Sequence, residues 1–382
     1  MAKERQELVL RRMTEEKFID EKEKDYVNNE ELSYADIEAP NAPHFSLWVK
    51  ELLVEKYGEK VVEQGGLRVT TTLDATLQEF AQKSVREEIN KLAKSNVKNA
   101  AVIVTQPETG EILAMVGSKD WDAKDEDGRV NIIFARRQPG SAIKPLNYAL
   151  ALKTGKITLS TAIADVPTCF SVAGQPVYCP SNYDGAFHGL TQIRFALGNS
   201  YNVPAVKVLA LNGIDNFVDF AREMGITTFE DPSKYGLSLT LGGGEVRPLD
   251  MAVAFGVFAN SGIRQSLNPI LKVEDWKGKV YQEFDPQKNE GVRVVSPEVA
   301  FLISHTLHDN NARTDAFGPS SLLNVRGHGE VSVKTGTTND RRDNWTIGYT
   351  KDVVVTVWVG NNDNTAMKSS VSGVSGASPI WN

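Results

Sequence analysis

The sequence has 382 residues, of which 41% are hydrophobic and 24% charged, and its formal net charge is −7. This length suits one large domain and a smaller one, and the composition is that of a globular protein that can build a large core. A negative net charge without a basic block argues against nucleic acid as the main partner. The sequence shows no run of the roughly 18 apolar residues expected of a transmembrane helix, and no signal peptide.

The N-terminal quarter of the chain predicts helices and one strand. Residues 1–34 are dense in Lys and Glu with apolar residues at helical spacing, which indicates a solvated helix pair. Residues 35–97 contain a short helix from Phe45 to Tyr57 and a strand from Leu67 to Thr72. Asp74 is a good N-cap for a helix after that strand. Residues 35–66 are interpreted as a mixed connector, and a new, larger domain is expected to begin near residue 98.

The larger domain, residues 98–382, is predicted to have an α+β fold. Strands 100–104 and 111–116 form a hairpin at its start, and strands 344–349 and 353–359 form another near its end. The stretch between the two hairpins is predicted to be mostly helical. Strands at both ends with helices between them indicate a largely antiparallel sheet flanked by helices.

A serine lies three residues before a lysine in the segment QPGSAIKP, residues 138–145, ahead of an apolar helical run. Positions i and i+3 of a helix are about 5–6 Å apart at Cβ, so the Lys144 amine is expected within reach of the Ser141 hydroxyl. Pro145 would clash with the carbonyl of residue 141 inside a regular helix. Ser141 is therefore expected at the helix N-terminus, where N–H groups and the helix dipole favour an oxyanion.

Two further motifs follow in order, SYN at residues 200–202 and KTGTT at residues 334–338. The second of these comes after a Val-Ser-Val strand. Other copies of the short patterns occur at 95–98, 153–155 and 266–268, in polar, helix-ending or turn contexts. The three motifs matter because a lysine acts as base for a serine only where burial or a neighbouring cation keeps it partly neutral.

The residue types of the three motifs suit acyl transfer. Ser141 would attack a carbonyl, Lys144 would take its proton, and Ser200 would relay that proton to the leaving amine. Asn202 would donate to Lys144 or to a substrate amide. Lys334 would lower the pKa of Lys144 and attract an anionic substrate.

The other residues of the third motif are expected to bind substrate. Thr335 and Thr337 offer hydroxyls to a substrate carboxylate, and Gly336 lets a substrate approach the strand edge closely. Thr338 belongs to the same substrate-binding group. The backbone N–H groups of Ser141 and Thr337 would form an oxyanion hole.

The ordered trio resembles the motifs of penicillin-binding proteins and serine β-lactamases. Together with LGGGEV at 241–246 and DNWTIGY at 343–349, it makes residues 98–382 resemble the transpeptidase domain of a class A (bifunctional) penicillin-binding protein. The resemblance implies the penicillin-binding/serine β-lactamase-like fold, with an antiparallel sheet of about five strands flanked by helices.

The N-terminal segments also resemble parts of that family. Residues 5–13 are similar to the tail of its upstream glycosyltransferase domain, and residues 35–97 to its interdomain linker. Residues 1–34 are thus interpreted as a remnant of the glycosyltransferase domain's C-terminus. The rest of that domain and the membrane anchor are expected to be missing.

The resemblance implies a serine D-Ala-D-Ala transpeptidase that works in peptidoglycan synthesis and cell wall biogenesis. Such an enzyme cleaves the terminal D-Ala of a stem peptide, forms an acyl-enzyme and passes the acyl group to an amine acceptor. The family also implies covalent inhibition by β-lactams, no cofactor and no metal. It implies a place in the bacterial cell envelope, on the extracytoplasmic face of the cytoplasmic membrane, with other cell-wall synthesis proteins as partners.

Three alternatives remain open at this point. A D,D-carboxypeptidase uses water as acceptor and shares every catalytic residue. A serine β-lactamase needs a second base for the deacylating water, and no carboxylate motif close after 200–202 suggests one. A non-catalytic β-lactam sensor is normally fused to a membrane signalling segment, which the sequence does not resemble.

Two cysteines, Cys169 and Cys179, lie in a loop-like segment rich in Pro and Gly. They could bridge a local hairpin in an oxidising compartment, with two free thiols as the alternative. His305 and His308 lie at i and i+3 on a predicted helix, as metal ligands can. Because no third ligand is evident, we expect a surface pair and no metal site.

Overall fold

The chain forms two compact units, residues 1–41 and residues 42–382. The computed structural model describes residues 2–30, 32, 42–124, 127–171, 177–338, 340–368 and 371–382. The predicted boundary between residues 34 and 35 lies outside the described residues.

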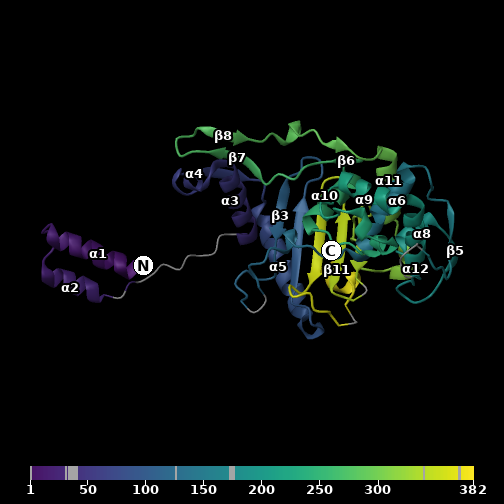
Figure 1. Cartoon of the computed structure of the whole chain (residues 1–382), viewed down its shortest axis with the longest axis horizontal. Helices are drawn as coiled ribbons and strands as arrows, with labels where there is room; N and C mark the ends of the chain where they lie inside the picture. Colours follow the sequence, from purple (N-terminus) through teal and green to yellow (C-terminus); the bar gives the residue numbers. More distant parts are fainter. Residues whose placement is uncertain are drawn as a thin grey trace. The chain divides into compact units, whose positions relative to one another are not determined.

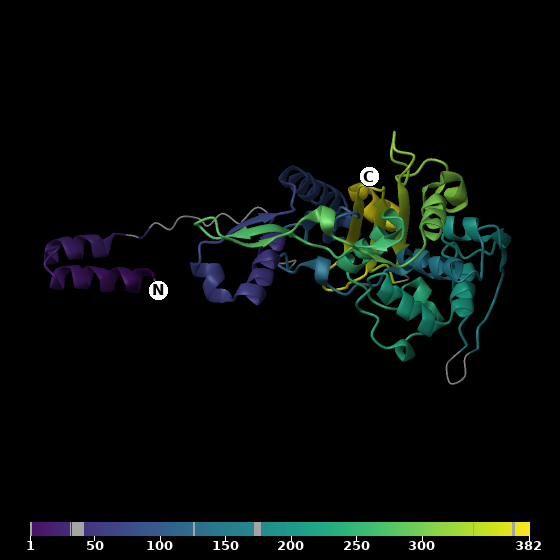
Figure 2. The same cartoon turned by 90° about the horizontal axis from the view of Figure 1, so that it is seen from above.

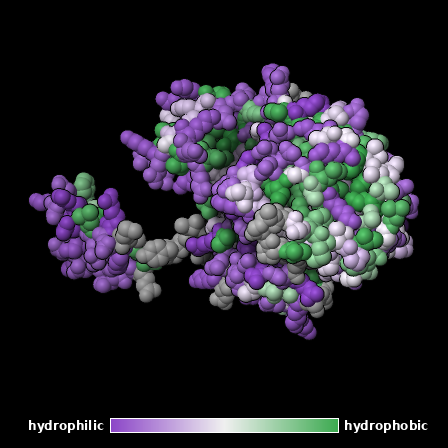
Figure 3. Space-filling view, turned by 45° about the vertical axis from the view of Figure 1, so that its right-hand side comes forward, coloured by the Kyte–Doolittle hydropathy of each residue, from purple (hydrophilic) through white to green (hydrophobic). Residues whose placement is uncertain are grey.

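The first unit contains two helices, α1 (Ala2–Glu15) and α2 (Glu21–Asn29). Lys3 Nζ on α1 donates a hydrogen bond to the carbonyl of Asn28 at 2.6 Å. Asp20 caps α2 through a capping box, which satisfies N–H groups at the helix start. The surface of this unit is largely hydrophilic in Figure 3, so the predicted solvated helix pair is confirmed.

The second unit contains the remaining helices. They are α3 (Pro43–Tyr57), α4 (Glu59–Gln64), α5 (Ala75–Lys91), α6 (Lys144–Lys153), α7 (Ile193–Gly198), α8 (Asn202–Asn212), α9 (Ile214–Glu223), α10 (Pro248–Ala259), α11 (Pro297–His308), α12 (Asn310–Phe317) and α13 (Ser378–Trp381). Among the described residues, no helix is both long and apolar enough to cross a membrane.

A five-stranded antiparallel sheet forms the centre of the second unit. Its strands, in spatial order, are β10 (Ser332–Thr337), β11 (Asp343–Tyr349), β12 (Val354–Gly360), β2 (Asn99–Thr105) and β3 (Ile112–Val116). The last strand of the chain therefore pairs with the first strand of this sheet, as the adjacent yellow and blue arrows of Figure 1 show. Both predicted hairpins and the α+β fold with about five strands are confirmed.

Helices cover both faces of this sheet, so its central strands are apolar on both sides. All seven residues of β2 are buried. Ala101 and Ile103 belong to one hydrophobic cluster, whereas Val102 and Val104 belong to a second cluster with residues of α5. This division follows the period of two along a strand, in which successive side chains point to opposite faces.

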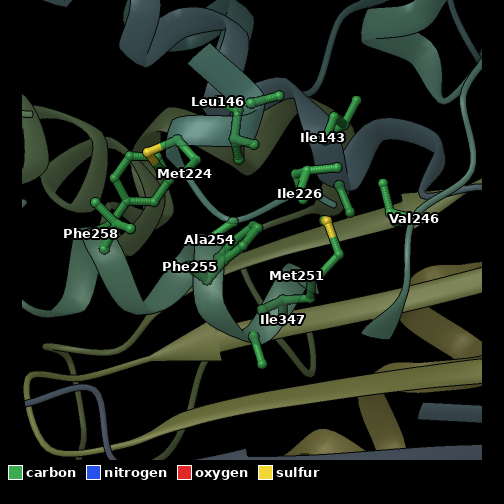
Figure 4. Packing of buried hydrophobic residues seen from close by; sticks show 14 of the residues in the cluster. Ile143, Leu146, Met224, Ile226, Val246, Met251, Ala254, Phe255, Phe258 and Ile347 are labelled. Atoms are coloured by element: carbon green, nitrogen blue, oxygen red, sulfur yellow. The ribbon is translucent and has the colours of Figure 1, made fainter. Parts of the chain in front are cut away.

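Helix α10 lies between the sheet and the helix that carries the first motif. Met251 and Phe255 of α10 and Leu146 of α6 are fully buried and share one cluster with Ile347 of β11 (Figure 4). A helix that is apolar on all sides, as α10 is, is stable only when buried. The packing anchors α6 to the sheet.

Three smaller sheets complete the second unit. One has the order β1 (Arg68–Thr71), β7 (Ile270–Glu274), β8 (Val280–Glu283), and the others are the pairs β4 (Ala162–Asp165) with β5 (Gly189–Gln192) and β6 (Ile263–Arg264) with β9 (Val292–Arg293). Figure 2 shows the β7–β8 hairpin as an extended green ribbon. The segment interpreted as a linker thus shares a sheet with strands from much later in the chain.

The two cysteines close a short loop between β4 and β5. Phe170 and Tyr178 exchange two backbone hydrogen bonds of 2.8 and 2.9 Å. The sulfurs of Cys169 and Cys179, one residue outside this pair, lie 2.01 Å apart as a disulfide. The bridge joins the end of β4 to the segment that leads toward β5.

We predict that the intact mass of the protein, measured without reductant, is lower than that of the reduced protein by two hydrogen atoms. The chain-entropy account gives a bridge across 10 residues a stabilisation of about 3 kcal/mol, so the double variant Cys169→Ser/Cys179→Ser should melt at a lower temperature. Equal masses, with both thiols open to labelling, would show that the bridge does not form.

Candidate active site

The first motif lies at the N-terminal end of α6. Gly140–Ile143 form a short 3₁₀ helix, which we call the serine turn, and α6 continues from it with Pro145 in its first turn. The proline takes a position where no N–H is required, since the first N–H groups of a helix have no partner inside it. The prediction that Ser141 lies at the helix N-terminus is confirmed.

The serine turn packs backbone to backbone against the edge strand β10. Gly140 has φ +53°, and a Cβ on it would lie 2.6 Å from the carbonyl oxygen of Thr337. A Cβ on Gly336 would lie 2.3 Å from the carbonyl oxygen of Pro139, and one on Gly242 (φ +94°) would lie 2.3 Å from the Gly140 nitrogen. Contacts this short exclude any side chain at these glycines.

The structure shows a packing reason for a glycine at position 336. We predicted that it lets a substrate approach the strand edge. The space that its side chain would occupy is instead filled by the serine turn, with Ala142 Cβ 3.0 Å from the added atom. The absence of a side chain at Gly336 therefore lets the serine turn pack closely on β10, while the expected approach of a substrate to the strand edge stays a prediction.

Lys144 is completely buried behind the serine turn. Its Nζ donates to the carbonyl of Ser200 at 2.5 Å, to Asn202 Oδ1 at 2.7 Å and to Ser200 Oγ at 3.3 Å. The Ser141 hydroxyl, which we expected to contact this amine, makes no hydrogen bond within the part of the chain that the structure describes. The first and second motifs are nevertheless brought together directly through Lys144.

Lys334 approaches the same point from strand β10. Its Nζ donates to Ser200 Oγ at 2.8 Å and to the carbonyl of Thr335 at 2.8 Å. Ser200 Oγ therefore lies between two amines, Lys144 at 3.3 Å and Lys334 at 2.8 Å. This arrangement joins all three motifs.

The surroundings of the two amines favour their neutral forms. Burial, and secondly the positive charge of Lys334, lower the pKa of Lys144 well below its usual value, while Asp165 acts in the opposite direction. Burial also lowers the pKa of Lys334 to about 7. The expectation that Lys334 depresses the pKa of Lys144 is in line with these effects.

Ser200 has a backbone conformation that is rare for a residue with a side chain, φ +63°. It follows the C-terminus of α7, where its N–H donates to the carbonyl of Leu197 and the N–H of Tyr201 donates to that of Ala196. A glycine is the usual residue at such a position. A serine held there points to a functional requirement for its hydroxyl.

Residues of the three motifs line one cavity at the surface of the second unit. The lining residues are Ser141, Tyr183, Asn199, Ser200, Asn202, Leu241, Ala316, Phe317, Thr335, Thr337, Ser372, Gly373 and Val374. Lys144 and Lys334 lie behind this wall. The cavity is therefore open to a ligand at Ser141, while the amines stay away from water.

Two threonines of the third motif are held by other parts of the chain. Thr338 Oγ1 accepts hydrogen bonds from the N–H groups of Arg342 at 3.0 Å and Asp343 at 3.1 Å, so it stabilises the turn between β10 and β11. It is not among the residues that line the cavity. Thr337 does line the cavity, and its hydroxyl accepts from the N–H of Gly373 at 2.9 Å.

The sequence reasoning missed three kinds of site residue. Tyr183 and Phe317 bring aromatic rings to the cavity from loop or helix-end positions that carry no periodic signal. Gly373 and Val374 belong to a π-helix, Gly373–Ala377, whose small residues indicate a loop in the sequence. Behind the cavity, the buried carboxylate of Asp165 closes a hydrogen-bond network that only spatial proximity shows.

The two histidines on α11 lie apart from these motifs. The rings of His305 and His308 meet edge to face with centroids 4.9 Å apart. Arg194 Nη1 lies 2.8 Å from His305 Nδ1. Over the described residues, no group of three or more His, Cys, Asp or Glu side chains is arranged to hold a metal ion.

Comparison with known proteins gives a family match over most of the second unit. The family described as "Penicillin binding protein transpeptidase domain" matches residues 100–378. Penicillin-binding protein 1B of Vibrio cholerae is 31% identical over 387 aligned residues, covering 100% of this chain and 48% of that protein. Penicillin-binding protein 2D of Bacillus subtilis is 32% identical, with 100% and 54% covered. The chain spans about half the length of these relatives.

Solved structures show the same fold. Penicillin-Binding Protein 1A from Haemophilus influenzae superposes with a TM-score of 0.77 at 24% identity, covering 99% of this chain and 75% of that one. The PonA1 protein from Mycobacterium tuberculosis in complex with penicillin V gives a TM-score of 0.76 at 25% identity, with 90% and 92% covered.

We predict that Gly336→Ala destabilises the protein, because the added methyl would meet the backbone at Pro139 with no flexible side chain to move aside. Overpacking of this kind typically costs about 1–3 kcal/mol. Thermal melting monitored by circular dichroism measures the loss.

Gly329→Ala is the matched control for that variant, because a Cβ at Gly329 meets nothing within 4 Å. Its melting temperature should stay at the parent value. Equal melting of both variants and the parent would contradict the close packing of the serine turn on β10.

Proposed function

This chain belongs to the penicillin-binding protein transpeptidase family, and on that premise we propose that it is a serine D,D-transpeptidase that cross-links peptidoglycan stem peptides through an acyl-enzyme on Ser141. The observation that carries the proposal is that Ser200 lines the same cavity as Ser141 and that its hydroxyl lies between the buried amines of Lys144 and Lys334. Two buried amines beside a nucleophile supply the base that a serine hydroxyl needs.

Lys144 is the general base of this proposal. A neutral amine has two N–H donors and one lone pair. Donation to the carbonyl of Ser200 and to Asn202 Oδ1 uses both donors. In the neutral form the third contact, with Ser200 Oγ at 3.3 Å, therefore falls to the lone pair, which is the site that takes a hydroxyl proton. Ser141 Oγ loses its proton to this lone pair as it attacks the carbonyl carbon of the stem peptide.

Backbone N–H groups stabilise the charge that develops in this attack. A Cβ on Gly140 would lie 2.9 Å from the Thr337 nitrogen, so the backbones at Ser141 and Thr337 are close neighbours. We assign the N–H groups of these two residues as the oxyanion hole. Their contribution is electrostatic, since they are oriented before the reaction begins.

Ser200 carries the proton to the leaving group. The proton taken by Lys144 passes through Ser200 Oγ to the D-Ala nitrogen as the peptide C–N bond breaks, and free D-Ala departs. An acceptor amine then attacks the ester carbonyl, its proton returns to Ser141 Oγ, and the cross-linked peptide is released. Lys334, Thr335 and Thr337 bind the substrate carboxylate, with Gly336 and Thr338 supporting their strand.

The cavity wall favours slow reaction of the acyl-enzyme with water. Among the described residues that line the cavity there is no Asp or Glu. A β-lactamase needs a second base at this place, so the transpeptidase function is favoured over hydrolysis of β-lactams. A D,D-carboxypeptidase uses the same residues and differs only in its acceptor.

The proposed function extends to partners and location. β-Lactams are proposed as covalent inhibitors, in keeping with a solved neighbour in complex with penicillin V and another described as a ceftriaxone acyl-enzyme complex. We place the protein in the cell envelope, on the extracytoplasmic face of the cytoplasmic membrane, among other cell-wall synthesis proteins. Residues 1–34, 35–97 and 98–382 are proposed as glycosyltransferase remnant, linker and transpeptidase domain.

We predict that mixing the chain with a penicillin adds the mass of one drug molecule, and that this adduct persists for hours because water attacks it slowly. Ser141→Ala should show no adduct, whereas Ser320→Ala, which alters an exposed serine outside the cavity lining, should react like the parent. Intact-mass spectrometry over time measures all three.

Other outcomes of that experiment would change the assignment. An adduct that disappears and leaves hydrolysed drug would favour a β-lactamase. No adduct on a folded parent, or an adduct on Ser141→Ala, would refute Ser141 as the nucleophile.

We predict that acylation by an anionic penicillin slows as the pH rises above 7. The pKa of Lys334 is lowered to about 7, so the charge that attracts the drug is present below this pH and lost above it. In Lys334→Arg the cation does not titrate, and the alkaline decline should move well above its parent position, although the overall rate falls because the side chain differs in shape.

Second-order acylation rates measured between about pH 5 and pH 9 test this prediction. An alkaline decline at the same pH in parent and variant would assign it to another group.

A further inference from the structure

A buried carboxylate lies behind the second motif. Asp165 is the last residue of β4, opposite Gly189 in the pairing with β5, and its exposed fraction is 0%. Its Oδ2 accepts three hydrogen bonds, from Asn182 Nδ2 at 2.7 Å, from the N–H of His188 at 3.0 Å and from His188 Nδ1 at 2.7 Å. None of these residues belongs to the three motifs.

Asn182 connects this carboxylate to Asn202. Asn182 Oδ1 accepts from the Asn202 N–H at 2.7 Å, while Asn202 Nδ2 donates to the carbonyl of Ser181 at 2.8 Å. The remaining polar atom of that side chain, Asn202 Oδ1, accepts from Lys144 Nζ at 2.7 Å. A continuous path of hydrogen-bonded residues thus runs from Asp165 through Asn182 and Asn202 to the proposed base.

His188 connects the same carboxylate to Tyr201. The two rings stack with centroids 3.9 Å apart and planes 10° from parallel. Tyr201 stands between Ser200 and Asn202 in the chain, so its ring position constrains the backbone of the whole motif. Ser200 needs such support because its φ of +63° is unfavourable for a residue with a side chain.

The two oxygens of Asp165 differ in their partners, since Oδ2 accepts from Asn182 and His188. Its second oxygen, Oδ1, is buried and has no hydrogen-bond partner among the described residues. A buried oxygen without a partner costs free energy, and in an asparagine of the same shape an amide N–H₂ without a partner would take its place. The hydrogen bonds at Oδ2 therefore tie a buried acidic side chain to Asn182 and His188, the two residues that lead to the second motif.

We propose that Asp165 is a positioning residue for acylation: it holds Asn202 through Asn182, and Tyr201 through His188, in the arrangement that orients the Lys144 amine toward Ser141. This inference rests on the proposed function. Through its charge Asp165 also opposes the effects of burial and of Lys334 on the protonation of Lys144. Lys334 on β10 lowers the pKa of Lys144 and Asp165 on β4 raises it. Two further titratable groups belong to this network, namely His188, with Nδ1 at 2.7 Å from Asp165 Oδ2, and Asp184, with Oδ2 at 3.1 Å from His188 Nε2.

Three variants separate the positioning of Asn202 by hydrogen bonds from the effect of the Asp165 charge on Lys144. Asp165→Asn keeps one oxygen for the three donors and removes the charge. Asn182→Ala keeps the charge and breaks the path to Asn202. Asp352→Asn, an exposed aspartate in the β11–β12 turn, is the matched control. Each is tested by its second-order acylation rate with a fluorescent penicillin across pH, with its melting temperature measured alongside.

The expected results differ in kind. In Asp165→Asn the acid side of the pH–rate profile should move to lower pH, because the pKa of Lys144 falls when the negative charge is removed. In Asn182→Ala the rate should fall about tenfold to a hundredfold at every pH, the size expected when a catalytic group is misplaced. Asp352→Asn should match the parent in rate and profile.

The outcomes distinguish this inference from the proposed function. If the parent itself is not acylated on Ser141, the proposed function fails first. If the parent is acylated but Asp165→Asn keeps the parent profile and folded Asn182→Ala keeps the parent rate, the positioning role is overturned. A purely structural role would lower the melting temperature without moving the pH profile. If Asn182→Ala does not fold, the inference is judged from Asp165→Asn alone: a shift of the acid side of its pH–rate profile supports it, and an unchanged profile overturns it.

Discussion

Two lysine side chains are buried at one point with a single serine hydroxyl between them, and the rest of the site depends on this constraint. Lys144 comes from α6 and Lys334 from β10, and Ser200 Oγ lies 3.3 and 2.8 Å from their amines. Two cations this close and this far from water cannot both stay charged without a large cost. Burial therefore favours a neutral amine at this point, the form that Lys144 needs as the proposed base for Ser141.

Close backbone packing positions Ser141, the proposed nucleophile. The serine turn approaches β10 and the loop at Gly242 so closely that Gly140 and Gly336 admit no Cβ. The position of Ser141 thus follows from steric contact with the edge of the sheet, not from a hydrogen bond of its own side chain. Behind this turn, Asn182 donates a hydrogen bond to Asp165 and accepts one from the N–H of Asn202, the residue whose side chain contacts Lys144. Packing thus fixes the position of the proposed nucleophile, and polar contacts fix that of the proposed base.

Much of the fold was predictable from local sequence patterns, and a strand that was not predicted belongs to a sheet that joins segments far apart in the chain. The two hairpins of the central sheet and the helix from Phe45 to Tyr57 were predictable because alternation, helical spacing and turn residues act over short stretches. Strand β8 was missed because its residues are mostly exposed and do not alternate. Its partner β7 pairs with β1, some two hundred residues earlier in the chain. Such pairing depends on the tertiary fold and leaves no local pattern.

By itself the sequence determined the order and identity of the three motifs and the place of Ser141 at a helix start, since Pro145 imposes that start through local sterics. Only the tertiary structure decided what each polar group contacts. It directs Lys144 to Ser200 and Asn202 instead of Ser141, and gives the space beside Gly336 to the serine turn. These contacts join segments far apart in the chain, and the distances between such segments depend on the packing of the whole core, which no short stretch of sequence encodes.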